Sequence, residues 1–143
     1  MIFHAKIKKE EKGYQIQFLE LPNVVTYCEN KDDIRKIARD ALIGCIEEDL
    51  DRYLDIPLPK NINSRNIISI ALPLSLSCSI LFRKLRKQRG WTTAEVAKKL
   101  GISRQAYEKL ESSKANHSAQ TIERVLNVLG KACVDIEIEE LAA

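Results

Sequence analysis

Two side chains that can read DNA bases lie next to each other in the segment 92–112. Arg104 can pair with the O6 and N7 atoms of guanine, and Gln105 can pair with the N6 and N7 atoms of adenine. Both directly follow Ser103, a residue type that caps the N-terminus of a helix. The first turn of a recognition helix reaches base edges in the major groove. The spacing therefore predicts that this segment binds DNA.

The residues around this pair have the pattern of a helix-turn-helix. Ala97 supplies the small residue where two helices cross, and Gly101 forms the turn without the steric cost of a Cβ atom. Ile102 is the apolar residue expected just after the turn. Tyr107 and Leu110 can hold the second helix against the first. The pattern predicts that the polar residues between them are exposed.

Polar residues at the helix ends supply the other candidate contacts. Thr92 and Ser103 are expected to cap the two helices, and Glu95 completes a capping box with Thr92. Helix N-termini favour phosphate oxygens, and lysines add affinity that depends on salt more than on sequence. The candidate DNA-binding residues are Thr92, Thr93, Ser103, Arg104, Gln105, Glu108, Lys109 and Lys114, with Arg86 and Lys98 as further candidates for contacts to the phosphate backbone.

Positive charge is concentrated in the same part of the chain. The 143 residues carry a net charge of +3, but residues 78–124 hold 11 Lys and Arg against 4 Asp and Glu, a net +7. Residues 1–60 hold 10 against 12, a net −2. A basic segment of this kind fits a polyanionic partner, although an ordinary solvated helical surface can have the same composition.

The N-terminal half predicts a small α/β unit. Apolar and polar residues alternate in 3–8 and 14–18, residues 24–27 form a third expected strand, and apolar residues recur at helical spacing from 34 to 50. Asn30 is the expected N-cap of this helix, which would have about five turns. A final strand at 67–72 closes the sheet. The expected order of elements is β-β-β-α-β.

The C-terminal half predicts a helical unit, which the proline- and asparagine-containing segment 55–66 separates from the first. Ser75 is the expected cap of its first helix, with the cations of 83–89 on the solvent face and Gly90 at the end. A last helix follows the helix-turn-helix and ends at Gly130. Residues 134–138 alternate again and predict a short terminal strand. The expected fold class is α+β.

The composition favours a soluble, cytoplasmic protein without a cofactor. No apolar segment is long enough to span a bilayer, and residues 1–15 lack the apolar core of a secretion signal. The four cysteines lack the paired spacing that a zinc site needs, so each is expected to act as a small core residue. They are Cys28, Cys45, Cys78 and Cys133. We therefore expect no metal, no cofactor and no membrane partner.

The residue types do not favour catalysis. A magnesium-dependent nuclease site needs clustered carboxylates, but the strand at 3–8 contains none. The acidic residues of 47–51 are expected on a solvated helix end. His4 and His117 are single histidines outside any constellation of cysteine or serine and are expected to be surface or loop residues. We therefore expect that the chain is not an enzyme.

The segment 92–112 resembles the DNA-binding domain of the lambda-repressor/XRE class. This resemblance implies operator DNA as a partner. In that class the position of Thr93 is usually glutamine and the position of Tyr107 is usually a smaller aliphatic residue. The first departure leaves one phosphate contact of the class without its usual donor, and the second is expected to enlarge the local core.

The N-terminal half resembles the HicB antitoxin family. The family pattern of a strand, a proline-containing turn, a strand and a long helix matches residues 13–50, and its proline-containing linker matches 56–59. Leu19 lies where the family usually has proline, and Asn23 lies where it usually has glycine. Asparagine tolerates the left-handed conformation that glycine would supply. The resemblance continues through the helix-turn-helix and covers nearly the whole chain.

This resemblance implies a partial RNase H-like domain that binds and blocks a HicA-type toxin, an mRNA-cleaving ribonuclease. It assigns toxin binding to residues 1–60, completed by the strand at 66–72, and DNA binding to residues 74–143. A chain of this family would repress its own operon by binding operator DNA. In relatives of this type the last strand often pairs between two subunits, which implies a homodimer or a higher oligomer.

Two alternatives stay open at this point. The terminal strand can instead pack within one subunit. The N-terminal domain can instead sense a small ligand, in which case the chain is a plain transcriptional repressor. A short, basic, histidine-containing protein encoded beside this gene would favour the antitoxin over the ligand-sensing repressor.

Overall fold

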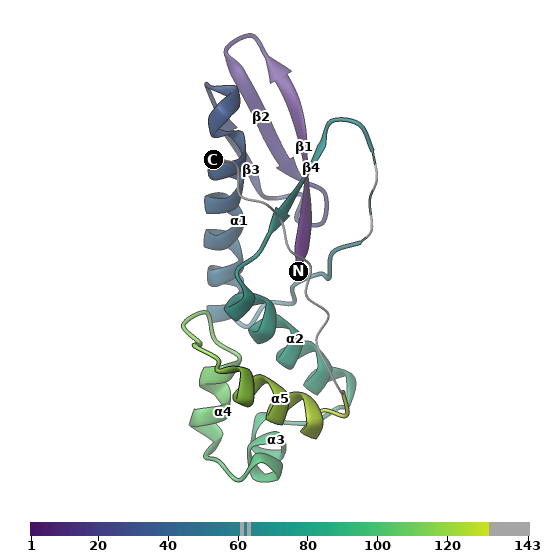
Figure 1. Ribbon diagram of the computed structural model, residues 1–143, viewed down its shortest axis with the longest axis vertical. Coiled ribbons are helices and arrows are strands. Elements are labelled where there is room, and N and C mark those ends of the chain that lie inside the picture. Colours follow the sequence, from purple (N-terminus) through teal and green to yellow (C-terminus); the bar gives the residue numbers. More distant parts are fainter. Residues whose placement is uncertain (61, 63, 132–143) are drawn as a thin grey trace. The chain divides into compact units, whose positions relative to one another are not determined.

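The computed structural model describes residues 1–60, 62 and 64–131, which form two compact units (Figure 1). The first unit comprises Met1–Ile46 and Asp55–Pro73. The described part of the second comprises Glu47–Leu54 and residues 74–131. The strand expected at 134–138 lies outside the described residues.

The first unit contains a four-stranded antiparallel sheet. Its strands are β1 (Ile2–Glu10), β2 (Gly13–Phe18), β3 (Val25–Cys28) and β4 (Ile67–Ala71), in the order β3-β2-β1-β4. The helix between β3 and β4 completes the predicted order β-β-β-α-β. Each strand was predicted to within about two residues at either end. Period-two patterning was therefore sufficient to find this sheet.

The turn between β1 and β2 requires glycine. Gly13 pairs with Glu10 in the strand register and has a φ of +103°, which side chains rarely adopt. A Cβ atom at Gly13 would also overlap the carbonyl oxygen of Cys28 on β3. The hairpin that aligns β1 with β2 thus depends on the absence of a side chain at this position.

The long helix after β3 begins slightly later than predicted. A 3-10 turn at Lys31–Asp33 precedes α1 (Ile34–Asp51), which has 18 residues. Asn30 occupies the N-cap position of the 3-10 turn, but its side chain makes no capping hydrogen bond to the backbone. Its amide nitrogen instead donates to Asp33 Oδ2 at 3.3 Å. The N-cap position predicted for Asn30 is therefore confirmed for the 3-10 turn, but its side-chain oxygen does not accept a capping hydrogen bond.

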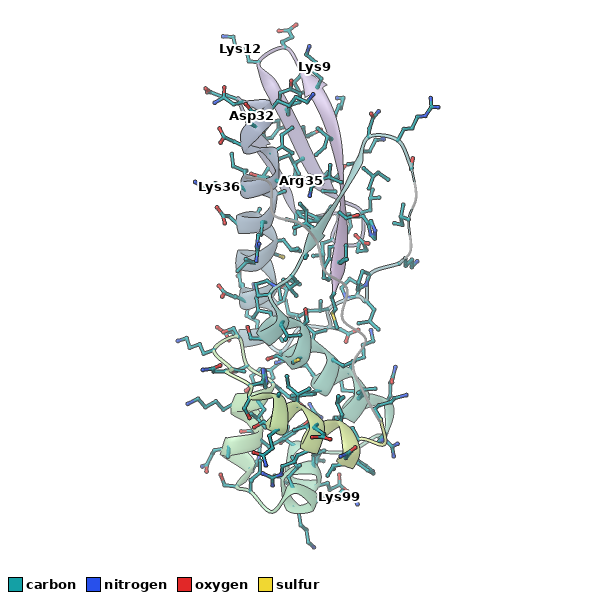
Figure 2. The ribbon with its side chains drawn as sticks, in the orientation of Figure 1. Lys9, Lys12, Asp32, Arg35, Lys36 and Lys99 are labelled. Carbon is teal, nitrogen blue, oxygen red and sulfur yellow. The ribbon has the colours of Figure 1, made fainter. Side chains whose placement is uncertain are left out.

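The apolar stripe predicted on α1 is confirmed. Its residues recur every four positions and are at most 8% exposed: Ile34, Ala38, Leu42, Ile46 and Leu50. α1 lies alongside the sheet in Figure 1, and the strands bury Phe3, Ala5, Ile16, Phe18 and Ile70. Figure 2 shows Arg35 directed from α1 toward the strands, where its Nη1 atom donates to the carbonyl oxygen of Ser69 on β4 at 3.1 Å. The core of the first unit thus lies between α1 and the sheet.

His4 does not lie on the surface, as the sequence suggested. It is 8% exposed, and its Nδ1 atom lies 2.6 Å from the Oε1 atom of Glu20. The backbone nitrogen of His4 also donates to Glu20 Oε2 at 3.0 Å. Alternation along β1 assigns His4 correctly to the face opposite Phe3, but both residues are buried. A central strand can be covered on both faces, which alternation alone does not reveal.

The second unit is helical over the residues that the structure describes beyond Pro73. Its helices are α2 (Leu74–Gln88), α3 (Thr93–Leu100), α4 (Arg104–Leu110) and α5 (Ala119–Val128). Ser75 was predicted to cap α2 but lies within its first turn, because the helix begins at Leu74. A core cluster joins the four helices through Cys78, Phe82, Leu85, Val96, Ala97, Leu100, Tyr107, Val125, Leu126 and Leu129.

Two arginines of α2 are buried against one carboxylate instead of lying on the predicted solvent face. Arg86 donates from Nε to Glu111 Oε1 at 2.7 Å and from Nη2 to Glu111 Oε2 at 2.8 Å. Its Nη1 atom donates to the carbonyl oxygen of Trp91 at 3.0 Å. Arg83 donates from Nη2 to the carbonyl oxygens of Leu50 and Glu111 at 2.8 and 2.9 Å. The Glu111 side chain is only 3% exposed. This cluster connects α2 to the end of α4.

We predict that Glu111→Ala lowers the free energy of unfolding of the second unit by about 3–5 kcal/mol. The change leaves the guanidinium groups of Arg83 and Arg86 buried without their carboxylate. Urea unfolding of the full chain, followed by the fluorescence of its single tryptophan, Trp91, measures this effect.

Glu48→Ala is the matched control. Glu48 forms an exposed ion pair with Arg52 at 3.1 Å, and such pairs contribute less than about 1 kcal/mol. Equal destabilisation by the two substitutions would contradict the role assigned to the buried carboxylate.

Candidate nucleic-acid interface

The helix-turn-helix predicted from the sequence is formed by α3 and α4. Gly101 ends α3 in the left-handed conformation, with φ of 70° and ψ of 31°. Ala97 is 2% exposed and Tyr107 is fully buried, while Ile102 and Leu110 pack against the core cluster as partly buried residues. Each of these five residues thus has the position that the pattern predicted. They bury one side of α4 and leave the opposite side to solvent.

Both predicted helix caps are present. The Oγ1 atom of Thr92 accepts from the backbone nitrogen of Glu95 at 3.2 Å, and Glu95 Oε2 accepts from the backbone nitrogen of Thr92 at 2.7 Å. The bond from the Thr92 backbone nitrogen, together with one from the Thr92 hydroxyl to the same carboxylate oxygen, holds the pKa of Glu95 below its usual value. Ser103 Oγ accepts from the backbone nitrogen of Ala106 at 3.1 Å. The caps determine where α3 and α4 begin and thus which residues occupy their first turns.

The charged side chains on the exposed side of α4 are not independent of one another. Arg104 Nε donates to Glu108 Oε1 at 2.6 Å, one helical turn along. The hydroxyl of Thr93 on α3 donates to the same oxygen at 3.0 Å. Both hydrogen bonds hold the pKa of Glu108 below its usual value, and the bond from Arg104 has the larger effect. Three of the candidate residues therefore form one hydrogen-bonded group.

The other candidates lie around this group. Gln105 and Lys109 are exposed on α4, and Lys98 is exposed on α3. Lys114 follows α4 in the loop and lines the same cavity of about 280 Å³ as Glu108. The structure thus places Arg104, Gln105, Glu108 and Lys109 on one short helix, with Lys114 close to it.

Arg86 does not belong to this surface. Each nitrogen of its guanidinium group donates to Glu111 or to the Trp91 carbonyl oxygen, and its side chain is 13% exposed. Its candidacy for a phosphate contact is therefore wrong. The sequence could not reveal this, because Glu111 lies 25 residues further along the chain.

A basic and aromatic cluster near α3 was missed in the sequence. The Arg89 guanidinium carbon lies 5.0 Å from the centre of the Trp91 ring, and Lys99 Nζ lies 4.8 Å from it. Lys99, labelled in Figure 2, is exposed on α3. Cations at these distances are attracted to the electron-rich face of the ring. Trp91 beside a basic segment was a possible signal, but its contact with Lys99 depends on the folding of α3.

Neither a metal centre nor a membrane span is present in the described part of the chain. No group of three or more His, Cys, Asp or Glu side chains there could hold a metal ion. No helix among the described residues is long and apolar enough to cross a membrane. Cys28 and Cys78 are buried, and Cys45 is partly buried. Burial raises the pKa of the Cys78 thiol, which disfavours its reactive thiolate form.

Comparisons with known proteins match both halves of the chain. Residues 3–81 match the family described as the HicB-like antitoxin of bacterial toxin-antitoxin systems, and residues 82–136 match a helix-turn-helix family. The chain belongs to the HicB-like antitoxin family and carries a helix-turn-helix domain.

Curated relatives are similar over most of their length. Antitoxin HicB 2 of Photorhabdus laumondii is 24% identical over 131 residues, which cover 92% of each chain. Antitoxin HicB of Escherichia coli strain K12 is 26% identical over 121 residues, or 85% of this chain and 87% of the relative. The resemblance noted in the sequence is thus confirmed at the level of the family.

We predict that Thr93→Val raises the pKa of Glu108 toward its usual value. The substitution removes the hydroxyl that donates to the ionised carboxylate but keeps a side chain of similar shape. A folded-state pKa below the usual value means that the bond stabilises the fold above that range of pH. This stabilisation is lost as the pH falls through the folded-state pKa. A carboxyl NMR titration measures the change.

Glu95 is the internal control for this titration. Its carboxylate is bonded to Thr92 and not to Thr93, so its pKa should be the same in both proteins. A Glu108 pKa that does not move in Thr93→Val would contradict the bond between α3 and α4.

Proposed function

We propose that this chain is an antitoxin that binds and neutralises a HicA-type toxin and represses its own operon by binding operator DNA. One observation carries the proposal: an antitoxin-family match and a helix-turn-helix with an exposed polar recognition helix occur in the same chain. Such a chain can connect the amount of bound toxin to transcription of the operon. Both of its expected partners, DNA and an mRNA-cleaving toxin, favour action in the cytoplasm.

The second unit would bind operator DNA through α4 in the major groove. Arg104 would pair with guanine and Gln105 with adenine, since both are exposed in the first turn of α4. Lys109 and Lys114 would contact phosphates, as would the start of α4 at Ser103, whereas the backbone N–H and the hydroxyl of Thr92 at the start of α3 both donate to Glu95. Base contacts would supply the preference for sequence, and phosphate contacts would supply affinity. Residues 74–143 would form this DNA-binding domain.

The first unit would bind the toxin. Its family match and its sheet with a long helix support a partial RNase H-like domain, with residues 1–60 as the core and the strand at 66–72 closing the sheet. Its role would be regulatory and not enzymatic. A nuclease would need carboxylates gathered around magnesium, whereas the buried carboxylate of Glu20 is bonded to His4.

A ligand-sensing repressor is the second candidate function. A groove of about 640 Å³ in the first unit has partly apolar walls and a basic rim, and its volume is within the range of small-molecule sites. It is lined by Ile7, Lys9, Tyr14, Lys31, Asp32, Ile34, Arg35, Asn66 and Ile68. A repressor of this kind would have no toxin encoded beside its gene.

Co-purification with the product of the neighbouring gene tests the main proposal. We expect a stable complex, loss of the partner's ribonuclease activity in that complex, and binding of the complex or the free chain to DNA from upstream of the operon. A neighbour that neither binds the chain nor cleaves RNA would overturn the antitoxin proposal and favour the ligand-sensing repressor.

We predict that Arg104→Ala weakens operator binding and relaxes base preference. A bidentate contact to a base contributes about 1–3 kcal/mol of discrimination. Titration of operator and random duplexes by fluorescence anisotropy measures both effects. Lys109→Ala is the control, because loss of a phosphate contact should weaken binding to both duplexes alike and reduce its salt dependence. If Arg104→Ala weakens binding to both duplexes equally, Arg104 contacts a phosphate and not a base.

We also propose that the chain forms a homodimer or higher oligomer through the strand expected at 134–138. An unpaired strand leaves backbone groups that a second subunit can satisfy. Removal of residues 134–143 is predicted to lower the molar mass measured by light scattering. An unchanged mass would reject this strand as the subunit contact.

A further inference from the structure

We propose that Glu108 is a positioning residue, which holds Arg104 so that the outer edge of its guanidinium group reads guanine. The proposal rests on the DNA binding proposed above and adds a specific role within it. Glu108 was a candidate for direct DNA contact. Its bonds to Arg104 and Thr93 favour a role through Arg104 instead.

The contacts of Glu108 come from two helices. Arg104 lies one turn before it on α4, and the Arg104 Nε atom is 2.6 Å from Glu108 Oε1. The hydroxyl of Thr93, the first residue of α3, is 3.0 Å from the same oxygen. A bond within α4 alone would leave the pair able to swing on that helix. The bond to Thr93 connects it to α3 and restricts this motion.

The bond at Nε determines which donors of Arg104 are available to DNA. A guanidinium group has five N–H donors, one on Nε and two on each terminal nitrogen. No other hydrogen bond of Arg104 is found within the described parts of the chain, so both terminal nitrogens retain their donors. A pair of terminal nitrogens can bind O6 and N7 of guanine together. The arginine side chain is 68% exposed, so Glu108 orients it without covering it.

The same geometry limits what Thr93 can do. A hydroxyl group has one hydrogen to donate, and Thr93 gives it to Glu108. A phosphate oxygen is only an acceptor, so the Thr93 hydroxyl cannot bind it while this bond is present. Thr93 is thereby assigned to the support of Arg104. In the resembling DNA-binding class the usual glutamine at this position offers two donors and an acceptor instead.

The charge of Glu108 separates this role from a purely structural one. A carboxylate near DNA repels the phosphates, so its removal should leave non-specific binding unchanged or stronger. The orientation of Arg104 is lost at the same time, so the preference for guanine should decrease. A substitution that merely damaged the fold would weaken both kinds of binding. Opposite effects on affinity and on base preference thus identify a positioning residue.

Selection from a random duplex library tests the proposal with the full-length protein. The position at which Arg104→Ala loses its guanine preference defines the base read by Arg104. At that position we expect Glu108→Ala to reduce the preference for guanine by about 3- to 10-fold, a partial loss of the roughly 5- to 150-fold preference that one bidentate contact provides. Thr93→Val should have a smaller effect in the same direction. Affinity for a random duplex should not fall for either variant.

Two conservative variants keep the bonds and serve as matched controls. Glu108→Gln retains an oxygen that accepts from Arg104 and Thr93, and Thr93→Ser retains the hydroxyl. Both should keep most of the guanine preference. Urea unfolding of every variant, followed through Trp91, identifies any loss of binding that comes from loss of the fold.

Several outcomes would overturn the proposal. Unchanged guanine preference in Glu108→Ala would remove the positioning role. Loss of a preference for cytosine would instead make Glu108 a direct reader of a base, since carboxylates accept from cytosine N4. A wild-type chain that selects no sequence would overturn the DNA-binding function itself, and this role with it. If the wild-type chain binds DNA selectively and Glu108→Ala keeps the same selectivity, the positioning role fails while the DNA-binding function stands.

Discussion

The buried carboxylate of Glu111 is the constraint on which the second unit depends. α4 has only seven residues, too few for a helix to persist in water without packing. Glu111 caps its C-terminal end and is bonded through both oxygens to Arg86 on α2. Arg83, which lies one turn before Arg86 on α2, donates to the backbone carbonyl oxygen of Glu111. The polar cluster and the buried ring of Tyr107 thus fix the inner side of α4, and its outer side can carry side chains for recognition.

Two carboxylates three residues apart on α4 therefore have different roles. Glu111 is buried and joins α4 to α2, while Glu108 is partly exposed and joins Arg104 to α3. Residues three apart on a helix point about 60° apart around its axis, so the two carboxylates lie on adjacent parts of the same side, and their different partners on α2 and α3 separate their roles. The burial of the α2 arginines Arg83 and Arg86 also removes them from the exposed surface around α4. α4 is consequently bonded to two different helices, to α2 through Glu111 and to α3 through Glu108.

Local signals in the sequence predicted most of the fold, and long-range pairing explains the failures at Arg83, Arg86 and His4. The caps at Thr92 and Ser103 and the left-handed Gly101 depend on residues a few positions apart, and all three were found correctly. The inward positions of Arg83 and Arg86 depend on Glu111, more than 20 residues away, and a basic stretch on a helix is ordinarily solvated. The surface position predicted for His4 is wrong for the same reason, because its partner Glu20 lies on a separate segment of the chain. For the candidate interface, the sequence identified which side chains are exposed but not the bond network that joins Thr93, Glu108 and Arg104.

That network changes how the charge of the second unit is interpreted. All five arginines of residues 78–124 donate hydrogen bonds within the protein: Arg83, Arg86, Arg89, Arg104 and Arg124. The planar fork of arginine suits such fixed bonds, whereas the hydrated ammonium of lysine suits a phosphate contacted as a point charge. Arg83 and Arg86 are also buried beside Glu111, so the net +7 of this segment overstates the number of cations available to a polyanion. Exposed lysines such as Lys98, Lys109 and Lys114 remain available, and in the proposed DNA complex they would provide salt-dependent affinity while Arg104 would provide sequence preference.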